Sequence, residues 1–314
     1  MRNTLFIFDN QARDARYVAY RLLGSGGSGD VWAGFQNDVL PIAIKVKKAS
    51  TDAARDLQAW YKEQWVHLQC IHHPHIVQTY DQFSTNAGLL VLIMELAEGD
   101  LQTAIYKGVR YSPKDVCAVA LQLLSALSYI HGLPVYHRDV TPKNILLFNN
   151  GRTFKLGDFS ASRINLQRGE LAKTMIGQKG YYPHELLGAG QFSCAQSDIY
   201  QLGVVLLTLL NGLPPIPQHA TLEEAKRLTL EAAPRRLAES LIKKYGRTAE
   251  IIAKMLPRTL AYRYATAMQA WADFDAQYKA LVDAENTASA KVKNATIALG
   301  TIGALYALST LTTK

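Results

Sequence analysis

A cluster of polar residues lies directly before a run of aliphatic residues in the stretch YHRDVTPKNILL, residues 136–147. The cluster places Asp139 and Asn144 five positions apart. Polar side chains beside a buried strand cost free energy unless they have a partner or a ligand. A carboxylate can take up a proton, and Asp and Asn oxygens are suitable ligands for a hard divalent cation. The stretch is therefore a candidate for proton transfer or metal chemistry.

A glycine-rich segment near the start of the chain, GSGGSGDV, has a G-x-G-x-x-G frame formed by Gly24, Gly26 and Gly29. The residues on both sides favour β-strands, whereas a dinucleotide-binding loop would lead from a strand into a helix. A glycine hairpin between two strands can place backbone N–H groups over phosphate oxygens. Val31, on the returning strand, would then cover an adenine ring.

The next predicted strand contains a lysine, Lys45, in the sequence AIKV. Because side chains alternate along a strand, Lys45 points to the side opposite Ile44 and Val46. That side could be solvent, or it could direct the ammonium group toward phosphates and toward Glu63 on the predicted helix that follows. The order of glycine loop, lysine strand and acidic helix favours the phosphate-binding interpretation.

The elements that must position these residues change in type along the chain. Residues 17–48 and the runs HIVQTYDQF and LLVLIMEL have the composition and alternation of β-strands. One helical pattern follows the lysine strand, over residues 52–69. After Pro113 helical patterns dominate, over residues 114–132, 197–211, 221–244 and 248–282. Strands first and helices second predict an α+β protein of two lobes, a small β-rich N-lobe and a larger helical C-lobe, with a cleft near residues 95–100.

The composition excludes several classes of protein. The 314 residues are 48% hydrophobic and 19% charged, which is typical of a globular chain. The net charge of +8 suits an anionic partner, but no basic run is interleaved with aromatic residues, so we expect no nucleic-acid partner. The cysteines are few and odd in number, which favours a reducing compartment, and their spacing makes a zinc site unlikely. The histidines 72, 73 and 75 have no partnering cysteines, so we expect no metal site there. The initial apolar run LFIF is too short for a secretory signal.

The motifs together resemble those of the protein kinase family, the eukaryotic-like (Hanks-type) Ser/Thr protein kinases. HRDVTPKN (137–144) is similar to the catalytic loop of that family, and LGDFSASR (156–163) is similar to its DFG segment. GYYPHE (180–185) stands at the A-P-E motif, and SDIYQLGVVLLTLL (197–210) resembles the buried helix that carries an aspartate, here Asp198. Arg263 matches the arginine that pairs with the A-P-E glutamate, Glu185. The resemblance covers roughly residues 17–275.

The resemblance implies a two-lobed protein kinase that transfers the γ-phosphoryl group of ATP to Ser/Thr hydroxyls of proteins, itself included. Asp139 would accept the hydroxyl proton, and Asn144 and Asp158 would hold Mg²⁺ or Mn²⁺. Lys45 would contact the α- and β-phosphates, with Glu63 as the carboxylate that positions it. His137, Asp198 and the Glu185–Arg263 pair would have structural roles. The implied nucleotide pocket consists of Gly24, Gly26, Gly29, Val31, Ala43, Lys45, Met94, Glu95, Ala97 and Leu146, with residues 95–97 as the hinge.

Four positions depart from the family pattern. Ser/Thr kinases have a lysine two residues after the catalytic aspartate, where this chain has Thr141, and a threonine before A-P-E, where it has Gln178. Lys143 lies four residues after Asp139, where tyrosine kinases have an arginine, and we predict that it supplies the charge near the γ-phosphate. Ser160 replaces the glycine of DFG and so restricts the backbone there.

These departures leave three alternatives: a tyrosine or dual-specificity kinase, a pseudokinase that binds nucleotide and acts as a scaffold, and a small-molecule kinase of the antibiotic-phosphorylating kind. The presence of all nucleotide and metal residues disfavours the pseudokinase. The A-P-E-like segment and Arg263 disfavour the small-molecule kinase. Arg138 would receive a phosphate on the activation segment, residues 158–185, and Thr174 is the preferred phosphosite.

The motifs divide the chain into an N-terminal extension (1–16), an N-lobe (17–97), a C-lobe (98–275), a linker or helical stalk (276–293) and a hydrophobic tail (294–313). The tail has twenty residues without a charge and is flanked by lysines. At ~1.5 Å per residue it would span ~30 Å, one bilayer core. We expect a cytoplasmic catalytic domain that acts on proteins and is anchored by this tail to the inner or cytoplasmic membrane. The alternative is a helix docked on the kinase or a partner, and the oligomeric state is not predicted.

Overall fold

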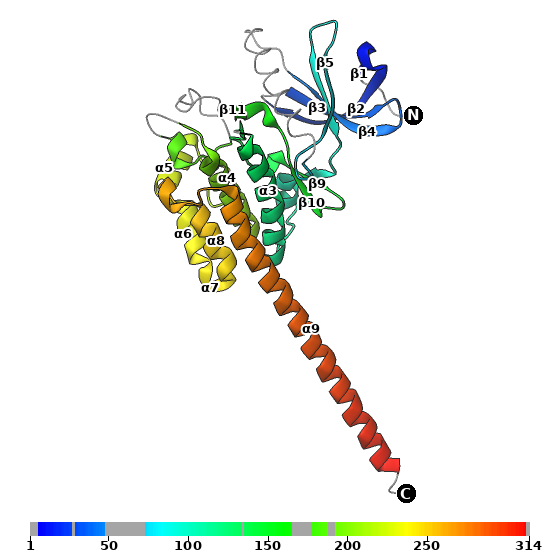
Figure 1. Cartoon of the computed structure of the whole chain (residues 1–314), viewed down its shortest axis with the longest axis vertical. Helices are drawn as coiled ribbons and strands as arrows, with labels where there is room; N and C mark the ends of the chain where they lie inside the picture. Colours follow the sequence, from blue (N-terminus) through cyan, green and yellow to red (C-terminus); the bar gives the residue numbers. More distant parts are fainter. Residues whose placement is uncertain are drawn as a thin grey trace.

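The computed structural model describes residues 6–26, 29–47, 73–133, 135–164, 178–187 and 192–311, and only the backbone at residues 11, 163, 164 and 290–311. The β-strands of its first part gather at one end of the molecule, and most of the α-helices lie at the other (Figure 1). This arrangement confirms the predicted α+β fold of two lobes.

The N-lobe contains one antiparallel sheet of six strands in the order β1-β2-β3-β4-β6-β5. A tight turn with positive φ at Asn37 and Asp38 joins β3 to β4, as expected for these residue types. The aliphatic residues of the strands form the core of the lobe, where Ile42, Ile44 and Ile93 are fully buried. The strands are β1 (Phe6–Asn10), β2 (Ala15–Gly26), β3 (Gly29–Gln36), β4 (Leu40–Val46), β5 (Thr79–Ser84) and β6 (Leu90–Glu95).

The first strand comes from the segment that we expected to precede the N-lobe. β1 pairs with β2, and the 3₁₀ turn η1 (Gln11–Arg13) follows it. Asn10 Nδ2 and Tyr17 Oη both donate to Oδ2 of Asp81 on β5, at 2.7 and 2.6 Å. Asp81 is buried. The Asn10–Asp81 bond connects the two edge strands of the sheet, β1 and β5, and the Tyr17–Asp81 bond connects β2 to β5.

The C-lobe is built around α4 (Ala195–Asn211), in which 14 of 17 residues are buried. A helix that is apolar on all sides must lie inside a domain. α3 (Pro113–Gly132) packs against α4, and it begins with a capping box between Ser112 and Asp115 and with Pro113 in its first turn. Gly212, with φ 81°, ends α4.

Short strands and turns between the lobes carry the loops of chemical interest. β7 (Gly99–Asp100), β9 (Ile145–Phe148) and β10 (Thr153–Leu156) form a three-stranded sheet, and β8 (Val135–Tyr136) pairs with β11 (Arg163–Ile164). The helix α2 (Leu101–Tyr106) follows β7. The 3₁₀ turn η2 (Pro142–Asn144) lies between β8 and β9, η3 (Phe159–Ala161) between β10 and β11, and η4 (His184–Leu186) between β11 and α4.

The last third of the chain is more divided than the sequence pattern indicates. The ranges predicted to be helical, 221–244 and 248–282, form four helices and the start of a fifth: α5 (Leu222–Leu230), α6 (Ala233–Ser240), α7 (Ile242–Tyr245), α8 (Arg247–Met255) and α9 (Ala267–Leu311), with η5 (Leu260–Tyr262) before α9. The breaks coincide with positive φ at Ala232 and Gly246 and with Pro257. α9 packs on α3 and α8 and continues as a helix through residues 276–293.

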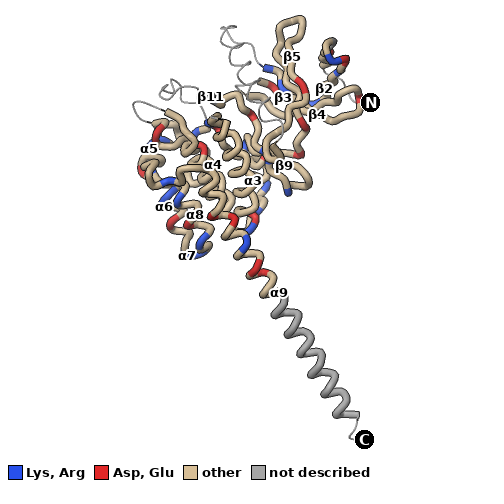
Figure 2. The backbone as a smooth tube through the Cα atoms, in the orientation of Figure 1, with Lys and Arg blue, Asp and Glu red and all other residues tan. Residues whose placement is uncertain are grey.

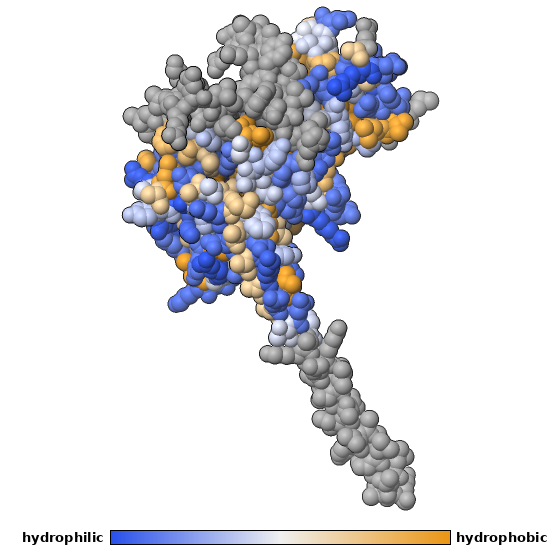
Figure 3. Space-filling model, viewed as in Figure 1, coloured by the Kyte–Doolittle hydropathy of each residue, from blue (hydrophilic) through white to orange (hydrophobic). Residues whose placement is uncertain are grey.

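Charged residues of both signs alternate around α6, α7 and α8 (Figure 2), and several of them pair within one helix turn. On the face shown in Figure 3, hydrophobic residues lie in small separate groups among hydrophilic ones. Among the described residues, one helix, α3, is long and apolar enough to cross a bilayer. Half of its apolar stretch is buried inside the protein. The side chains of residues 294–313 lie outside the described part.

Candidate active site

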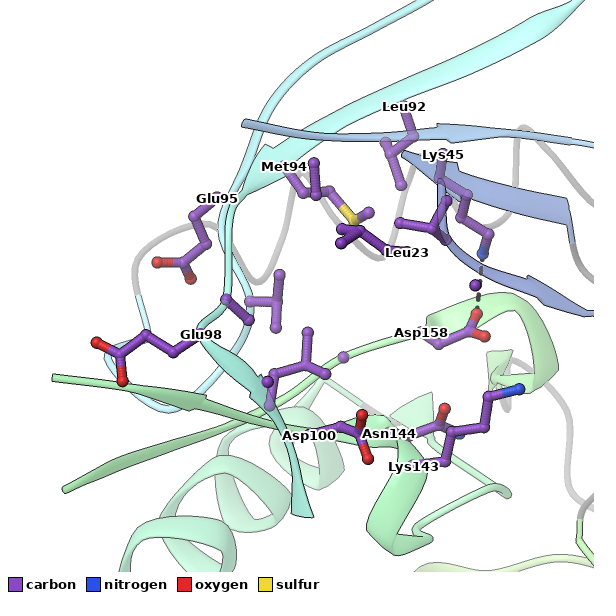
Figure 4. Close-up of a pocket in the computed structure, with 18 of the residues that line it drawn as sticks. Leu23, Lys45, Leu92, Met94, Glu95, Glu98, Asp100, Lys143, Asn144 and Asp158 are labelled. Carbon is purple, nitrogen blue, oxygen red and sulfur yellow. Dashed lines mark hydrogen bonds and ion pairs between the residues drawn. The ribbon is translucent and has the colours of Figure 1, made fainter. Parts of the chain in front are cut away.

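A cavity of about 350 Å³ opens between the two lobes (Figure 4). Eleven of the residues predicted to bind nucleotide, phosphate or metal line it: Gly24, Val31, Ala43, Lys45, Met94, Glu95, Ala97, Lys143, Asn144, Leu146 and Asp158. The volume lies in the range of about 300–1,000 Å³ that small-molecule sites occupy. The strands β2, β3, β4 and β6 supply one wall, and β7, β9 and the loops around them supply the other.

Lys45 projects from β4 into this cavity and pairs with Asp158, with 2.9 Å between Nζ and Oδ1 (Figure 4). Asp158 adopts a left-handed backbone conformation, and its carboxylate also accepts from the backbone N–H of Ser160. Burial disfavours the charged carboxylate, but the charge and hydrogen bond of Lys45 outweigh it, so the pKa of Asp158 lies well below its usual range. Asp158 is therefore ionised and directed into the cavity.

Asp139 and Asn144, the two residues that opened the sequence analysis, are in direct contact. Asn144 Nδ2 donates to Oδ2 of Asp139 at 2.7 Å and to its backbone carbonyl at 2.9 Å. The backbone N–H of Gln178 donates to Oδ1 at 3.3 Å. Burial raises the pKa of Asp139 above its usual value, although His137 and Asn144 act in the opposite direction. A raised pKa makes this carboxylate a better proton acceptor.

The backbone around Asp139 is held by one turn of the buried helix α4. Asp198 accepts from the N–H groups of His137 and Arg138 at 2.9 and 2.8 Å. Gln201 accepts from the N–H of Val140 at 3.1 Å and donates to the carbonyl of Arg138 at 3.0 Å. Arg138 has φ 71°, a conformation that costs a non-glycine residue free energy. The four hydrogen bonds therefore fix a strained segment.

His137 and Phe159 connect this loop to the segment of Asp158. The His137 ring lies edge-on to Phe159, with 4.8 Å between ring centroids, and its Nε2 lies 3.0 Å from the carbonyl oxygen of Gly157. His137 is fully buried. These contacts agree with the predicted structural role of His137 and set Asp139 and Asp158 in one frame.

Lys143 reaches across the cleft toward the glycine loop. A Cβ atom built on Gly26 would lie 3.7 Å from Lys143 Nζ. Gly26 and Gly29 do not line the cavity, although Gly24 does. Gly29 has another constraint, because a Cβ there would lie 2.4 Å from the carbonyl oxygen of Val46 on β4. Only glycine allows this approach of the two strands.

The side chain of Glu95, a predicted hinge residue, has a role that the sequence did not indicate. Glu95 ends β6, and both of its oxygens accept from Lys155 Nζ on β10 at 2.7 Å. Its Oε1 also accepts from the backbone N–H of Gln78 at 2.7 Å. Both charged side chains are mostly buried. Glu95 therefore connects the N-lobe to a C-lobe strand behind the cavity.

Several lining residues were not predicted from the sequence: Arg21, Leu23, Val77, Leu92, Glu98, Gly99, Asp100 and Gly157. Asp100 begins α2, and its side chain accepts from the backbone N–H and hydroxyl of Thr103. The aspartate followed by a helical segment is an N-cap signal that would have located Asp100 in the sequence. Glu63 and Thr174 lie outside the described residues.

The A-P-E-like segment is attached to the C-lobe by a buried ion pair. Arg263 Nη1 lies 2.9 Å from Oε1 of Glu185, with side-chain exposures of 0% and 5%. Arg263 also donates to the carbonyls of Pro257 and Gln196. The predicted Glu185–Arg263 pair is confirmed.

Comparisons with known proteins agree with this geometry. The family model described as protein kinase domain matches residues 17–273. Serine/threonine-protein kinase PkaB of Streptomyces coelicolor is 32% identical over 210 residues, 64% of this chain and 50% of PkaB. Sucrose non-fermenting protein kinase 1 of Fusarium virguliforme is 29% identical over 206 residues, 65% of this chain and 29% of that protein.

CBL-interacting serine/threonine-protein kinase 21 of Arabidopsis thaliana is 27% identical over 205 residues, 65% of this chain and 49% of that protein. The chain thus spans half or less of the length of these three relatives. The family model, however, covers most of the chain and both lobes of the structure. The chain belongs to the protein kinase domain family.

Proposed function

We propose that this chain is an active protein kinase that transfers the γ-phosphoryl group of ATP to serine or threonine hydroxyls of proteins. The observation that carries the proposal is that Lys45, Asp158 and Asn144 line one cavity between the lobes, and that Asn144 is hydrogen-bonded directly to Asp139. Two of the relatives, PkaB and CBL-interacting serine/threonine-protein kinase 21, are named as serine/threonine-protein kinases, which supports this hydroxyl specificity. The proposal also includes phosphorylation of the chain by itself.

The chemistry follows from alignment and charge. A hydroxyl oxygen forms a bond to the γ-phosphorus as the bond to ADP breaks, and Asp139 takes the hydroxyl proton. Lys45 is positioned to contact phosphate oxygens while it keeps Asp158 ionised. Lys143, near the glycine loop, would place a further positive charge at the γ-phosphate.

The donor set fits a divalent metal ion, and we propose Mg²⁺. Asp158 offers an ionised carboxylate. The amide nitrogen of Asn144 is committed to Asp139, so its carbonyl oxygen is the atom left for a ligand. Hard oxygen donors of this kind suit Mg²⁺, which when bound neutralises phosphate charge.

A transfer assay with the full chain tests the proposal. We would incubate the protein with radiolabelled ATP and with peptides whose only hydroxyl is Ser, Thr or Tyr. Label on the Ser and Thr peptides is expected, and Asp139→Asn and Lys45→Ala should each reduce it at least ~100-fold. Lys243→Ala, an exposed lysine on α7, is the matched control.

The outcomes separate the alternatives. Label mainly on the Tyr peptide would indicate a tyrosine or dual-specificity kinase. Binding of a fluorescent ATP analogue with no label on any peptide or on the chain would indicate a pseudokinase.

If Thr174 is an activating phosphosite, Thr174→Ala should lower the transfer rate, and mass spectrometry should find phosphate at that residue in the wild type.

We further propose that residues 294–313 anchor the chain to a membrane. The support is the twenty-residue segment without charge and the continuation of α9 to Leu311. The full chain should float with liposomes in a density gradient, whereas a variant with Leu299, Leu305 and Leu308 changed to Asp should not. Equal flotation of both proteins, or none of either, would contradict the anchor.

A further inference from the structure

A second groove, with a volume of about 250 Å³, lies in the C-lobe, and one of its lining residues, Gln178, is hydrogen-bonded to Asp139. Its walls come from α2, from the segment 178–181, from α4 and from the chain that follows α4. Tyr106 of α2 donates a hydrogen bond to Gln218, which joins two of these walls. The groove is smaller than the pockets of about 300–1,000 Å³ that hold small molecules.

The groove begins beside the catalytic carboxylate. Gln178, whose backbone N–H donates to Oδ1 of Asp139, lines it, and Lys179 and Gly180 continue its wall. Three residues of extended peptide span about 10 Å. A peptide whose hydroxyl lies at Asp139 would therefore place a side chain within three positions of that hydroxyl in the groove.

The lining has an apolar floor and a single sign of charge. Ile216, Val204 and Tyr181 are buried in it, and Pro214 and Pro215 form part of its rim. Among the described residues no Asp or Glu lines the groove, and Lys179 is its cation. Lys179 is exposed and gives one hydrogen bond to the carbonyl of Ala220. An ammonium group has three donors, so this bond leaves its charge and further N–H groups for a ligand.

We infer that this groove selects acceptor peptides that carry an acidic side chain within three residues of the target hydroxyl, and that it disfavours Arg or Lys there. The occupant is an extended acidic segment of the protein substrate, with Lys179 as the specificity-determining residue. The argument is charge complementarity, because a cationic peptide would meet Lys179 and, among the lining residues that the structure describes, no carboxylate. The inference rests on the proposed kinase function and adds a substrate class to it.

Positional scanning of peptides around one fixed Ser tests the inference with the full chain. For the wild type, Asp or Glu at a position near the hydroxyl should raise the rate about two- to five-fold over Ala, the size of an exposed ion pair, and Arg or Lys should lower it. Lys179→Glu should invert the preference, so that the ratio of the rates for Glu and Arg peptides falls at least ~10-fold. Lys179→Met should remove the charge preference without inverting it.

Two controls make the result specific. Lys243→Glu makes the same change in charge on α7, away from the groove, and should keep the wild-type ratio of rates. The KM for ATP should not change in Lys179→Glu, because Lys179 does not line the nucleotide cavity. A third measurement needs no variant: raising the salt concentration to 1 M should weaken the preference of the wild type for acidic peptides.

The failure of this inference is distinguishable from the failure of the proposed function. If no peptide and no residue of the chain receives label, the kinase function itself is wrong. If peptides are labelled but Arg or Lys is preferred near the hydroxyl, or if Lys179→Glu keeps the wild-type ratio, the kinase function stands and the acidic specificity is wrong.

Discussion

Lys45 Nζ lies 2.9 Å from Oδ1 of Asp158, although 113 residues separate the two in the sequence. The bond joins β4 of the N-lobe to the segment that follows β10 of the C-lobe. Only 7% of the Lys45 side chain is exposed. A buried ammonium group needs an anionic partner, and Asp158 supplies it. The same bond prepares Asp158 for a metal ion, because it keeps the carboxylate charged.

Lys45→Met should remove the positive charge that keeps the Asp158 carboxylate ionised. Without the ammonium group, burial is opposed mainly by the hydrogen bonds of Ser160, so the pKa of Asp158 should rise. Metal-dependent nucleotide binding should then be lost at a higher pH than in the wild type. Transfer should fall at least ~100-fold. Fluorescent ATP titrations in MgCl₂ between pH 4 and pH 8 measure the shift, with Lys243→Met as the control. An unchanged pH profile would show that Asp158 does not depend on Lys45.

The parts of the site that the sequence could predict are those with a local signature. Asp139 and Asn144 are five residues apart, and the glycine frame and the A-P-E-like segment are continuous stretches. The pairing of Glu185 with Arg263, 78 positions apart, was accessible only because the motifs resemble those of a known family. Alternation of apolar residues was sufficient for the strands of the N-lobe other than β1.

The parts that could not be predicted depend on long-range contacts between ordinary residues. Glu95 and Lys155 have no local pattern that indicates a bond across the hinge. Gln201 lies inside a run of buried apolar residues, and only the folded structure shows which backbone groups it meets. β1 is five residues long, too short for a reliable period, and Asn10 finds its partner Asp81 at 71 positions' distance.

Gln201 is a positioning residue for the proposed reaction, and Gln201→Ala should slow it. The change leaves the carbonyl of Arg138 and the N–H of Val140, on either side of Asp139, without their partner. Two lost bonds should cost ~1–3 kcal/mol of stability. We expect kcat to fall ~10-fold or more while the KM for ATP changes little, because Gln201 does not line the nucleotide cavity.

Gln201→Met gives the matched comparison. Methionine has a similar volume but forms neither hydrogen bond, so it removes both bonds without leaving a large cavity. Its kcat should therefore fall about as far as that of Gln201→Ala. A normal kcat in a destabilised Gln201→Ala protein would show that Gln201 stabilises the fold without positioning Asp139.

The hinge ion pair predicts a coupled effect in a double-mutant cycle. Lys155→Met leaves the mostly buried carboxylate of Glu95 without its cation, which should cost ~1–2 kcal/mol, less than for a fully buried pair. Glu95→Gln in the same protein should recover part of that loss. Urea unfolding of the four proteins measures the coupling, expected at ~0.5 kcal/mol or more. Additive effects would contradict a direct interaction.

His184 gives the fold a dependence on pH near the A-P-E-like segment. It is 8% exposed and packs edge-on to Tyr200, with 5.9 Å between ring centroids. Burial lowers the pKa of His184 to about 4, and Arg263 acts in the same direction. An unfolded histidine has a pKa of about 6.5. Between these values the unfolded chain binds a proton that the folded chain excludes, so stability is complete above pH 6.5 and falls as the pH drops toward 4.

His184→Gln should remove this contribution, because glutamine does not titrate. A lowered pKa of this size corresponds to ~2 kcal/mol lost between pH 6.5 and pH 5. The pKa values of His73 and His75 are lowered as well, so the quantity to compare is the difference in pH dependence between variant and wild type. Urea unfolding at pH 7.5 and pH 5 measures it, with His219→Gln, at an exposed histidine, as the control. If His184→Gln loses as much stability on acidification as the control does, His184 is protonated in the fold or its ring is solvated. In that case the burial beside Tyr200 and Arg263 does not set its charge.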